Sequence, residues 1–410
     1  MKSVRLSSRK SYRLLALAVS ALLLMGAAAD KPMSRAEVRR QADALTALGK
    51  RLFMDSALSA SGKLACASCH SPEHGFGPPD AAPVRMGGAD LARPGVRAVP
   101  SLTYLQATPP FTEHFFESED EGDESIDNGP TGGLTWDGRV DRGRDQARIP
   151  LLSPFEMANR DVPAVAERLR RAGYVPALRH VLRTPLDRPD RLVDAALRAL
   201  EAYEQDYRTF YPYSSKYDLY LAGKATLSPA EARGLALFED PAKGNCASCH
   251  VSARSRDGTP PQFTDFGLIA IGVPRNRAIP ANRDPAYFDL GLCGPVRTDF
   301  LGHADYCGLF KTPSLRNVAL RTVFMHNGVF TTLEQVMEFY VERDSAPEKW
   351  YGRNPDGTVD KFDDLPASYR DNINTDPPFD RHPGDQPALD AGEIRDVIAF
   401  LGTLTDGYRP

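Results

Sequence analysis

The chain has 410 residues, of which 42% are hydrophobic and 25% are charged, the composition of an ordinary globular protein. This length suggests two or three domains. The 54 acidic residues outnumber the 50 Lys and Arg, which argues against nucleic acid as a partner and permits a basic protein partner.

The N-terminus predicts a secretory signal peptide. Five basic residues precede an apolar stretch from Leu14 to Met25, and Ala27–Ala29 closes it with small residues. Cleavage after Ala29 would leave 45 basic against 54 acidic residues, a charge near −9. Because the apolar stretch is short for a membrane anchor, we expect a periplasmic protein, held at a membrane only if the signal is not cleaved.

Helical signals occur in five segments, and no segment shows the sustained alternation of a strand. Ser34 and Glu37 predict a capping box that opens a helix to about Met54, and Ser228 and Glu231 predict another. Apolar residues at helical spacing predict three further helices, around Val193, Ala196, Leu197 and Leu200, around Leu333, Val336, Met337 and Tyr340, and around Ile394, Val397, Ile398 and Leu401. The 34 Pro and 32 Gly predict long loops between the helices.

Two short cysteine motifs indicate the cofactor. They read Cys66-Ala-Ser-Cys69-His70 and Cys246-Ala-Ser-Cys249-His250. In this signature of haem c the thiols bond to one porphyrin edge and the histidine binds the iron. A zinc or redox site is the alternative, but neither motif has a second thiol pair close by and both carry the histidine. The sequence therefore predicts two covalently bound haems.

The surroundings of the two motifs repeat. Gly49-Lys-Arg-Leu-Phe53 precedes the first motif, and Gly234-Leu-Ala-Leu-Phe238 precedes the second. The repeat predicts a mainly α protein with two cytochrome c-like domains, each around one haem, with long loops. We place the signal peptide at residues 1–29, the N-terminal domain at 30–215 and the C-terminal domain at 216–410.

The two remaining cysteines, Cys293 and Cys307, stand apart from the motifs. In an oxidising export compartment this pair predicts a disulfide that closes a loop rich in Gly, Pro and Asp. Two free thiols are the alternative.

With these motifs the sequence resembles the bacterial dihaem cytochrome c peroxidases and the related MauG enzymes. The resemblance covers nearly all of the mature chain and rests on five segments: Leu48–Phe53, Trp136–Arg139, Pro154–Met157, Thr312–Asn317 and Phe324–Gly328. It implies that the N-terminal haem is the one that reacts with peroxide.

The resemblance also assigns residues around that haem. Counted from Trp136, Gln146, Pro150 and Glu156 match the residue types of the family. Glu156 would take a proton from the near peroxide oxygen and return it to the leaving oxygen. Gln146 would orient peroxide, Pro150 would restrict the pocket, and Trp136 would carry electrons between the haems. A surface or N-cap carboxylate and a core tryptophan are the plain structural alternatives.

For the C-terminal haem the resemblance implies His250 on one side of the iron and a ligand fourteen residues after His326 on the other. That position is Tyr340, as in the MauG branch, whereas the peroxidases have methionine. Anionic phenolate favours Fe(III), so this haem would store or relay electrons. A core tyrosine is the alternative, and Met337 and Met325 are rival ligands.

The chain departs from the family at two positions. Met86 stands where many peroxidases have a distal histidine, so we expect a five-coordinate first haem, with Met86 ligation as the alternative. Ala98 stands where the family has a calcium-binding Asn, which puts calcium in doubt.

Three functions remain. The first is reduction of hydrogen peroxide, fed by a small electron donor such as a cytochrome c or a cupredoxin, and a homodimer is compatible with it. The second is a MauG-like oxidation of a partner protein, but Gly244 replaces the tryptophan of the MauG route to the surface. The third, a plain electron-transfer cytochrome, leaves Glu156 and Gln146 unused. Several tyrosines could substitute for the missing tryptophan, but helix packing explains them as well: Tyr203, Tyr207, Tyr211, Tyr213, Tyr217 and Tyr220. We therefore favour the peroxidase.

Overall fold

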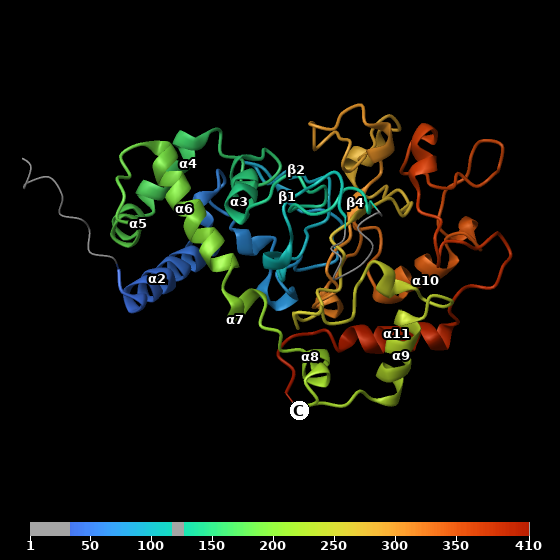
Figure 1. The fold of residues 1–410 in the computed structure, drawn as a ribbon. Helices are drawn as coiled ribbons and strands as arrows, with labels where there is room; N and C mark the ends of the chain where they lie inside the picture. Colours follow the sequence, from blue (N-terminus) through green and yellow to red (C-terminus); the bar gives the residue numbers. More distant parts are fainter. Residues whose placement is uncertain (1–32, 117–126, 410) are drawn as a thin grey trace, which may run out of the picture. The chain divides into compact units, whose positions relative to one another are not determined.

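A computed structural model describes residues 33–116 and 127–409 (Figure 1). The predicted signal peptide at 1–29 lies outside the described residues. The chain divides into two compact units, residues 1–43 and 44–410, and the packing below concerns the second. No helix in the described ranges combines the length and the apolar character needed to cross a membrane.

Helices are the main regular elements of the described residues. They are α2 (Arg35–Phe53), α3 (Gly143–Leu152), α4 (Val162–Arg171), α5 (Val175–Leu182), α6 (Pro189–Glu204), α7 (Tyr207–Phe210), α8 (Lys216–Leu221), α9 (Pro229–Glu239), α10 (Leu333–Glu342) and α11 (Ala391–Gly402). The strands are two residues long and form two antiparallel pairs: β1 (Met86–Gly87) with β2 (Arg93–Pro94), and β3 (Leu268–Ile269) with β4 (Phe310–Lys311). The prediction of a mainly α protein with long loops is confirmed.

The predicted helix starts are also confirmed, because their capping bonds are local. The Ser34 main-chain N–H donates to the Glu37 carboxylate at 2.8 Å, and the Glu37 N–H donates back to the Ser34 hydroxyl at 3.3 Å. Ser228 and Glu231 form the same reciprocal pair at the start of α9. The three helices predicted from apolar spacing are α6, α10 and α11.

Close helix crossings explain the glycines of the sequence repeat. Helix α9 packs against α11 (Figure 1), and a Cβ added at Gly234 would collide with the main-chain oxygen of Asp396. A Cβ at Gly49 would collide in the same way with the main-chain oxygen of Ala199 in α6. Both motifs therefore follow a helix that needs a glycine at its closest contact.

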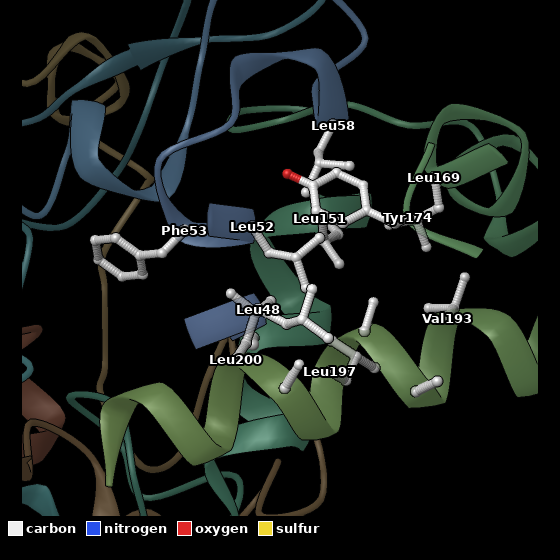
Figure 2. Packing of buried hydrophobic residues seen from close by; sticks show 14 of the residues in the cluster. Leu48, Leu52, Phe53, Leu58, Leu151, Leu169, Tyr174, Val193, Leu197 and Leu200 are labelled. Carbon is white, nitrogen blue, oxygen red and sulfur yellow. The ribbon is translucent and has the colours of Figure 1, made fainter. Parts of the chain in front are cut away.

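The buried apolar residues form three clusters. The first, part of which is seen in Figure 2, joins α3 to α6 and includes Leu52, Leu169 and Leu197. The second surrounds Phe238 and Phe400, and the third surrounds Leu292 and the two bonded cysteines. The first two clusters fall on either side of the predicted boundary at residue 215, but the division into two haem domains stays a prediction.

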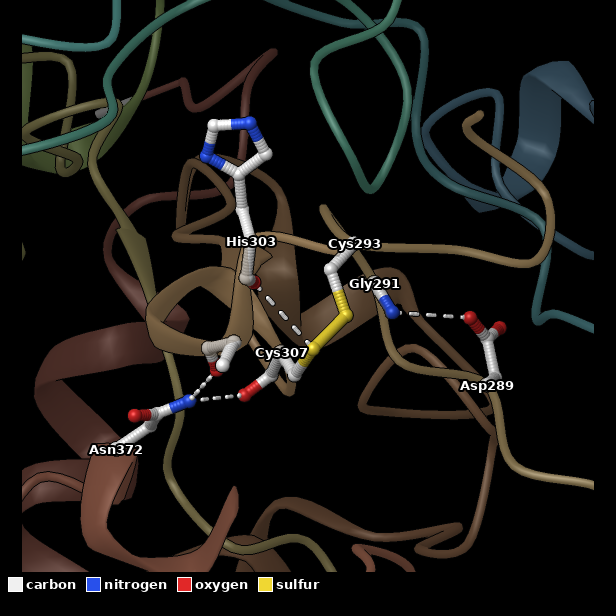
Figure 3. Close-up of a disulfide and its surroundings, with 7 residues drawn as sticks. Asp289, Gly291, Cys293, His303, Cys307 and Asn372 are labelled. Carbon is white, nitrogen blue, oxygen red and sulfur yellow. Dashed lines mark hydrogen bonds between the residues drawn. A yellow bond between two sulfur atoms is a disulfide. The ribbon is translucent and has the colours of Figure 1, made fainter. Parts of the chain in front are cut away.

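Cys293 and Cys307 are bonded to each other, which confirms the predicted disulfide (Figure 3). The Asn372 side-chain amide donates to the main-chain oxygens of Ala304 and Cys307 at 2.7 and 3.0 Å. On the other side of the loop, the Gly291 N–H donates to the Asp289 carboxylate at 3.2 Å. Asp289 therefore lies in the segment that leads into the crosslinked loop.

The helix crossing generates a stability prediction. We expect Gly234→Ala to lower the free energy of unfolding by about 1–3 kcal/mol, because the new Cβ meets main-chain atoms that cannot rotate away. This loss should outweigh the better helix propensity of alanine. Gly402→Ala at the end of α11 is the control, since nothing lies within 4 Å of its added Cβ. Denaturant titrations should separate the two variants, and equal stabilities would contradict the close crossing.

Candidate functional site

The first Cys-x-x-Cys-His motif holds its histidine in a defined orientation. Cys66–Ser68 forms a short 3-10 turn, and the His70 N–H donates to the Cys66 carbonyl at 2.9 Å. The His70 Nδ1 atom lies 3.0 Å from the Phe76 carbonyl oxygen, which can only accept, so Nδ1 carries the proton. Burial lowers the pKa of His70 to about 4. The ring is therefore neutral, and Nε2 is left with the lone pair that a metal needs.

The second motif repeats this arrangement. Cys246–Ser248 forms the turn, the His250 N–H donates to the Cys246 carbonyl at 2.8 Å, and His250 Nδ1 lies 2.9 Å from the Phe263 carbonyl. Burial again lowers the pKa of the histidine to about 4. In both motifs the imidazole is therefore neutral, and a main-chain carbonyl holds its Nδ1 atom.

A cavity of about 620 Å³ adjoins the second motif. Cys246, Cys249 and His250 line it, together with Trp136, Gln146 and Tyr340. The four motif cysteines are not in disulfides, and burial raises the pKa of both Cys66 and Cys246 to about 12. A largely apolar cavity beside two thiols and a fixed imidazole fits a haem.

All three candidate sixth ligands of the second haem lie in the wall of this cavity. They are Tyr340, Met337 and Met325. Burial raises the pKa of Tyr340, and the charges of Cys249 and Cys246 raise it further. The phenol therefore lies near the second motif, on the helix α10 where the sequence placed it. The choice among the three ligands stays a prediction.

Glu156 lies close to the first motif. Burial raises the pKa of Cys66 and Cys69, and the charge of Glu156 adds to both shifts. Although its side chain remains accessible to solvent, surrounding protein raises the pKa of Glu156, against the opposing effects of the Ser153 hydroxyl and Arg139. A solvent-accessible carboxyl with a raised pKa is suited to taking up and returning a proton.

The turn after α3 holds this carboxyl in place. The Glu156 N–H donates to the Ser153 carbonyl at 3.1 Å, and the Glu156 carbonyl accepts from the Gly88 N–H at 2.9 Å. The Met157 N–H donates to the Pro150 carbonyl at 3.0 Å, so Pro150 takes part in the same turn. A Cβ at Gly87 would collide with the Phe155 carbonyl. Sequence reasoning missed this contact between the Gly87–Gly88 loop and the turn of Glu156.

Met86, the residue weighed as an alternative ligand of the first haem, precedes that glycine. It lies on β1 and its side chain is 48% exposed. Gln146 lies on α3 and lines the 620 Å³ cavity. The structure therefore places Gln146 and Glu156 on α3 and on the turn that follows it, and it leaves their roles as predictions.

Trp136 is buried and fixed at both ends. Its indole N–H donates to the Ala98 carbonyl at 2.8 Å, and its main-chain oxygen accepts from the Lys311 N–H at 2.8 Å. Ala98 in turn donates to the His326 carbonyl at 2.7 Å. The His326 ring stacks on Phe310 with a centroid distance of 3.6 Å. The tryptophan thus lies between segments that are far apart in sequence, and its role between two haems stays a prediction.

The residue after this tryptophan belongs to a buried ion network that sequence reasoning missed. Asp137 is 0% exposed and accepts from Arg97 at 2.6 Å and from Arg139 at 2.9 Å. Arg97 also binds Asp289 through two bonds of 2.6 and 2.7 Å. Burial alone would raise the pKa of Asp137, but Arg97 and Arg139 lower it below its usual value. No local sequence pattern pairs Arg97 with Asp289.

The residues at the doubtful calcium position do not fit a calcium ion. Calcium takes six to eight oxygen ligands, whereas Ala98 has no side-chain oxygen and its carbonyl already accepts the indole. The nearby Lys311 ammonium donates to the Gly133 carbonyl at 2.7 Å. Burial lowers the pKa of Lys311 to about 8, opposed by the charge of Asp137. In the described ranges, no group of three or more His, Cys, Asp or Glu could hold a metal ion.

Comparison with known proteins agrees with this geometry. Residues 43–226 match the family described as di-haem cytochrome c peroxidase. The chain is 33% identical over 410 residues to the methylamine utilization protein MauG of Paracoccus denitrificans, covering 97% of both chains. It is 30% identical over 311 residues to the cytochrome-c peroxidase IdrP1 of Pseudomonas sp. strain SCT, covering 72% of this chain and 71% of the relative.

Solved structures show the same likeness. The diheme peroxidase BthA of Burkholderia thailandensis superposes with a TM-score of 0.76 at 41% identity, covering 88% of this chain and 86% of that one. The two motifs, the fixed histidines and these likenesses over most of the chain lead to one conclusion. The chain belongs to the family of dihaem cytochrome c peroxidases and MauG proteins, and it is an oxidoreductase of the peroxidase type with two haem cofactors.

Proposed function

We propose that this protein is a periplasmic peroxidase that reduces hydrogen peroxide to water at its N-terminal haem. Electrons come from a small donor such as a cytochrome c or a cupredoxin, and the C-terminal haem stores or relays them. The export signal and the disulfide support the periplasm. The acidic mature chain favours a donor with a basic surface.

The position of Glu156 carries this proposal. A protein that only transfers electrons has no use for a carboxyl beside one of its haem-attachment motifs. Glu156 lies beside the first motif, is accessible to solvent, and has a raised pKa. A carboxyl of this kind is suited to accept a proton and to release it again.

Each residue near the haems has a separate role in the proposed reaction. When bound, haem supplies the iron that binds peroxide and the redox centre that receives electrons. His70 and His250 hold their Nδ1 protons on main-chain carbonyls, which leaves Nε2 for the iron. Glu156 accepts the proton of the near peroxide oxygen and gives it to the leaving oxygen. The Gln146 amide orients peroxide, and Pro150 restricts the pocket.

Trp136 and Tyr340 serve the second haem in this proposal. Trp136 is fixed between Ala98 and Lys311 and provides an aromatic step between the haems. Tyr340 is the proposed sixth ligand, supported by its position in the cavity wall near Cys246 and Cys249. Its phenolate would stabilise the oxidised iron, which suits a centre that stores an oxidising equivalent.

A MauG-like oxidation of a partner protein is the second candidate. The identity of 33% to MauG of Paracoccus denitrificans along the whole chain favours it. Against it, Gly244 stands where the MauG route has a tryptophan. A Cβ at this glycine would lie 2.7 Å from the Leu237 carbonyl, so the backbone there has little room for a side chain.

Covalent attachment generates the simplest prediction. Both haems should stay with the polypeptide after acid-acetone extraction, because the four motif thiols are not in disulfides. The pyridine haemochrome assay should then give two haems per chain. The double variant Cys66→Ser, Cys69→Ser should retain one. A wild-type stoichiometry of one would rule out the two-haem assignment.

Ligation by Tyr340 predicts a spectroscopic change. Tyr340→Phe keeps the ring that packs 5.2 Å from Phe379 but removes the oxygen. The low-spin EPR signal should therefore change its g-values, whereas Met337→Leu should leave them as they are. Unchanged g-values in folded Tyr340→Phe would instead indicate Met337 or Met325.

The proposed role of Glu156 predicts that its replacement slows the reduction of peroxide. Glu156→Gln keeps the size of the side chain and removes the proton acceptor, so peroxide reduction should fall by about 10²–10⁴-fold. Haem content and the resting spectrum should stay normal, because Glu156 binds no iron. Trp136→Phe is the comparison: it should slow electron sharing between the haems and spare the first reaction with peroxide. Wild-type rates of Glu156→Gln in stopped flow would favour the electron-carrier function.

A further inference from the structure

Several tyrosines could in principle connect the interior to the surface, and the structure separates them. Tyr203 is enclosed in the first core against Phe53 and Phe210. The Tyr217 hydroxyl donates to a main-chain oxygen, that of Ser252, at 3.1 Å. A main-chain carbonyl cannot keep a proton, so this contact gives Tyr217 no base for its phenolic proton.

Tyr104 differs from these residues in two respects. It lines the 620 Å³ cavity that Trp136 and His250 also line. Its hydroxyl donates to the Asp406 carboxylate, with both oxygens at 2.9 Å. Among the tyrosines of the described chain that line this cavity, Tyr104 and Tyr340, Tyr104 is the one that donates a hydrogen bond to a carboxylate.

Tyr213 packs against Tyr104 on the side toward the surface. Tyr104 is 1% exposed, whereas Tyr213 is partly exposed, and their ring centroids lie 5.1 Å apart. The Tyr213 N–H donates to the Tyr104 hydroxyl oxygen at 3.0 Å. The Tyr213 hydroxyl accepts from the side-chain amides of Gln106 and Gln262 at 3.1 and 2.9 Å. The two rings therefore connect the cavity wall to the outside of the protein.

The charges around the pair favour a neutral tyrosyl radical. The Arg316 guanidinium lies 4.6 Å from the Tyr104 ring centroid and 4.7 Å from that of Tyr213. Asp218 pairs with this guanidinium at 2.9 Å and balances part of its charge, but a positively charged ring would still lie beside a buried cation. Loss of an electron from Tyr104 must then be accompanied by loss of its proton. Asp406 is placed to take it, and Ser214 and Asn317 hold that carboxylate with bonds of 3.0 and 2.8 Å.

We propose that Tyr104 and Tyr213 form the route by which electrons from an external one-electron donor reach the cavity, with Asp406 as the proton acceptor. This inference rests on the proposed peroxidase function. Tyr104 loses one electron to the oxidised cofactor and its phenolic proton to Asp406, which leaves a neutral radical and a carboxylic acid. An electron from the donor passes through Tyr213 to Tyr104, and Asp406 returns the proton. Two such cycles supply the two electrons that convert hydrogen peroxide and two protons into two waters.

The test uses the dihaem protein with tyrosine deuterated at the β-carbon, frozen after one equivalent of hydrogen peroxide in the absence of donor. EPR should show a tyrosyl radical whose hyperfine pattern depends on the label. Tyr104→Phe and Asp406→Asn should each lower this signal and the rate of electron delivery from reduced cytochrome c. We expect a loss of roughly 10²-fold, the lower end of the effect of removing a positioned proton acceptor.

Two further variants make the result decisive. Tyr213→Phe keeps its ring and its neighbours, and it should slow electron delivery even if Tyr104→Phe does not fold. Tyr217→Phe is the matched control, a buried tyrosine that donates to a carbonyl, and it should behave as wild type. A tyrosyl signal that survives in Tyr104→Phe, or that is lost in Tyr217→Phe, would overturn the proposed route.

The stopped-flow reaction with peroxide separates this inference from the proposed function. The first reaction of peroxide should proceed at the wild-type rate in Tyr104→Phe, because Tyr104 acts after O–O cleavage. Normal peroxide cleavage with no tyrosyl radical in the wild type would overturn the route and leave the peroxidase in place. Absence of any wild-type reaction with peroxide would overturn both.

Discussion

One contact is repeated in both halves of the molecule, and the site depends on it: a main-chain carbonyl that accepts the Nδ1 proton of a buried histidine. Phe76 provides this oxygen for His70, and Phe263 provides it for His250. A buried imidazole without such a partner would have an unpaired donor and no defined tautomer. Because the carbonyl fixes both the tautomer and the ring, Nε2 is left for iron and the adjacent thiols lie along the same turn.

The loops around Trp136 depend on buried charge. Arg97 joins Asp137, the neighbour of Trp136, to Asp289, which lies in the segment that leads into the disulfide-closed loop. Removing one partner of such a pair typically costs about 3–5 kcal/mol, because the other charge stays buried. The network therefore holds three loops in place without regular secondary structure. The ion pairs thus help to keep Trp136 in place in a region that has almost no β-structure.

The two halves share their attachment turn and differ in what stands near it. A carboxyl that can exchange protons with solvent lies by the first motif, whereas a buried phenol lies by the second. The first environment suits proton transfer to a small substrate, and the second suits stabilisation of an oxidised metal. The proposed division between a peroxide-binding haem and an electron-storing haem follows from this difference in polarity. The tyrosine pair adds a path on which proton and electron can move together.

The sequence by itself determined the features that are local. Each haem motif lies within five residues, and the helix caps at Ser34 and Ser228 join residues three apart, so their chemistry is readable from spacing. Only the tertiary structure decided the pairs that close over long separations: Arg97 with Asp289, 192 residues apart, and Tyr104 with Asp406, 302 residues apart. These residues lie outside regular helices and strands, so no periodic pattern links them. These pairs form because loops from distant parts of the chain pack together around the cavity. No single segment of the sequence contains that information.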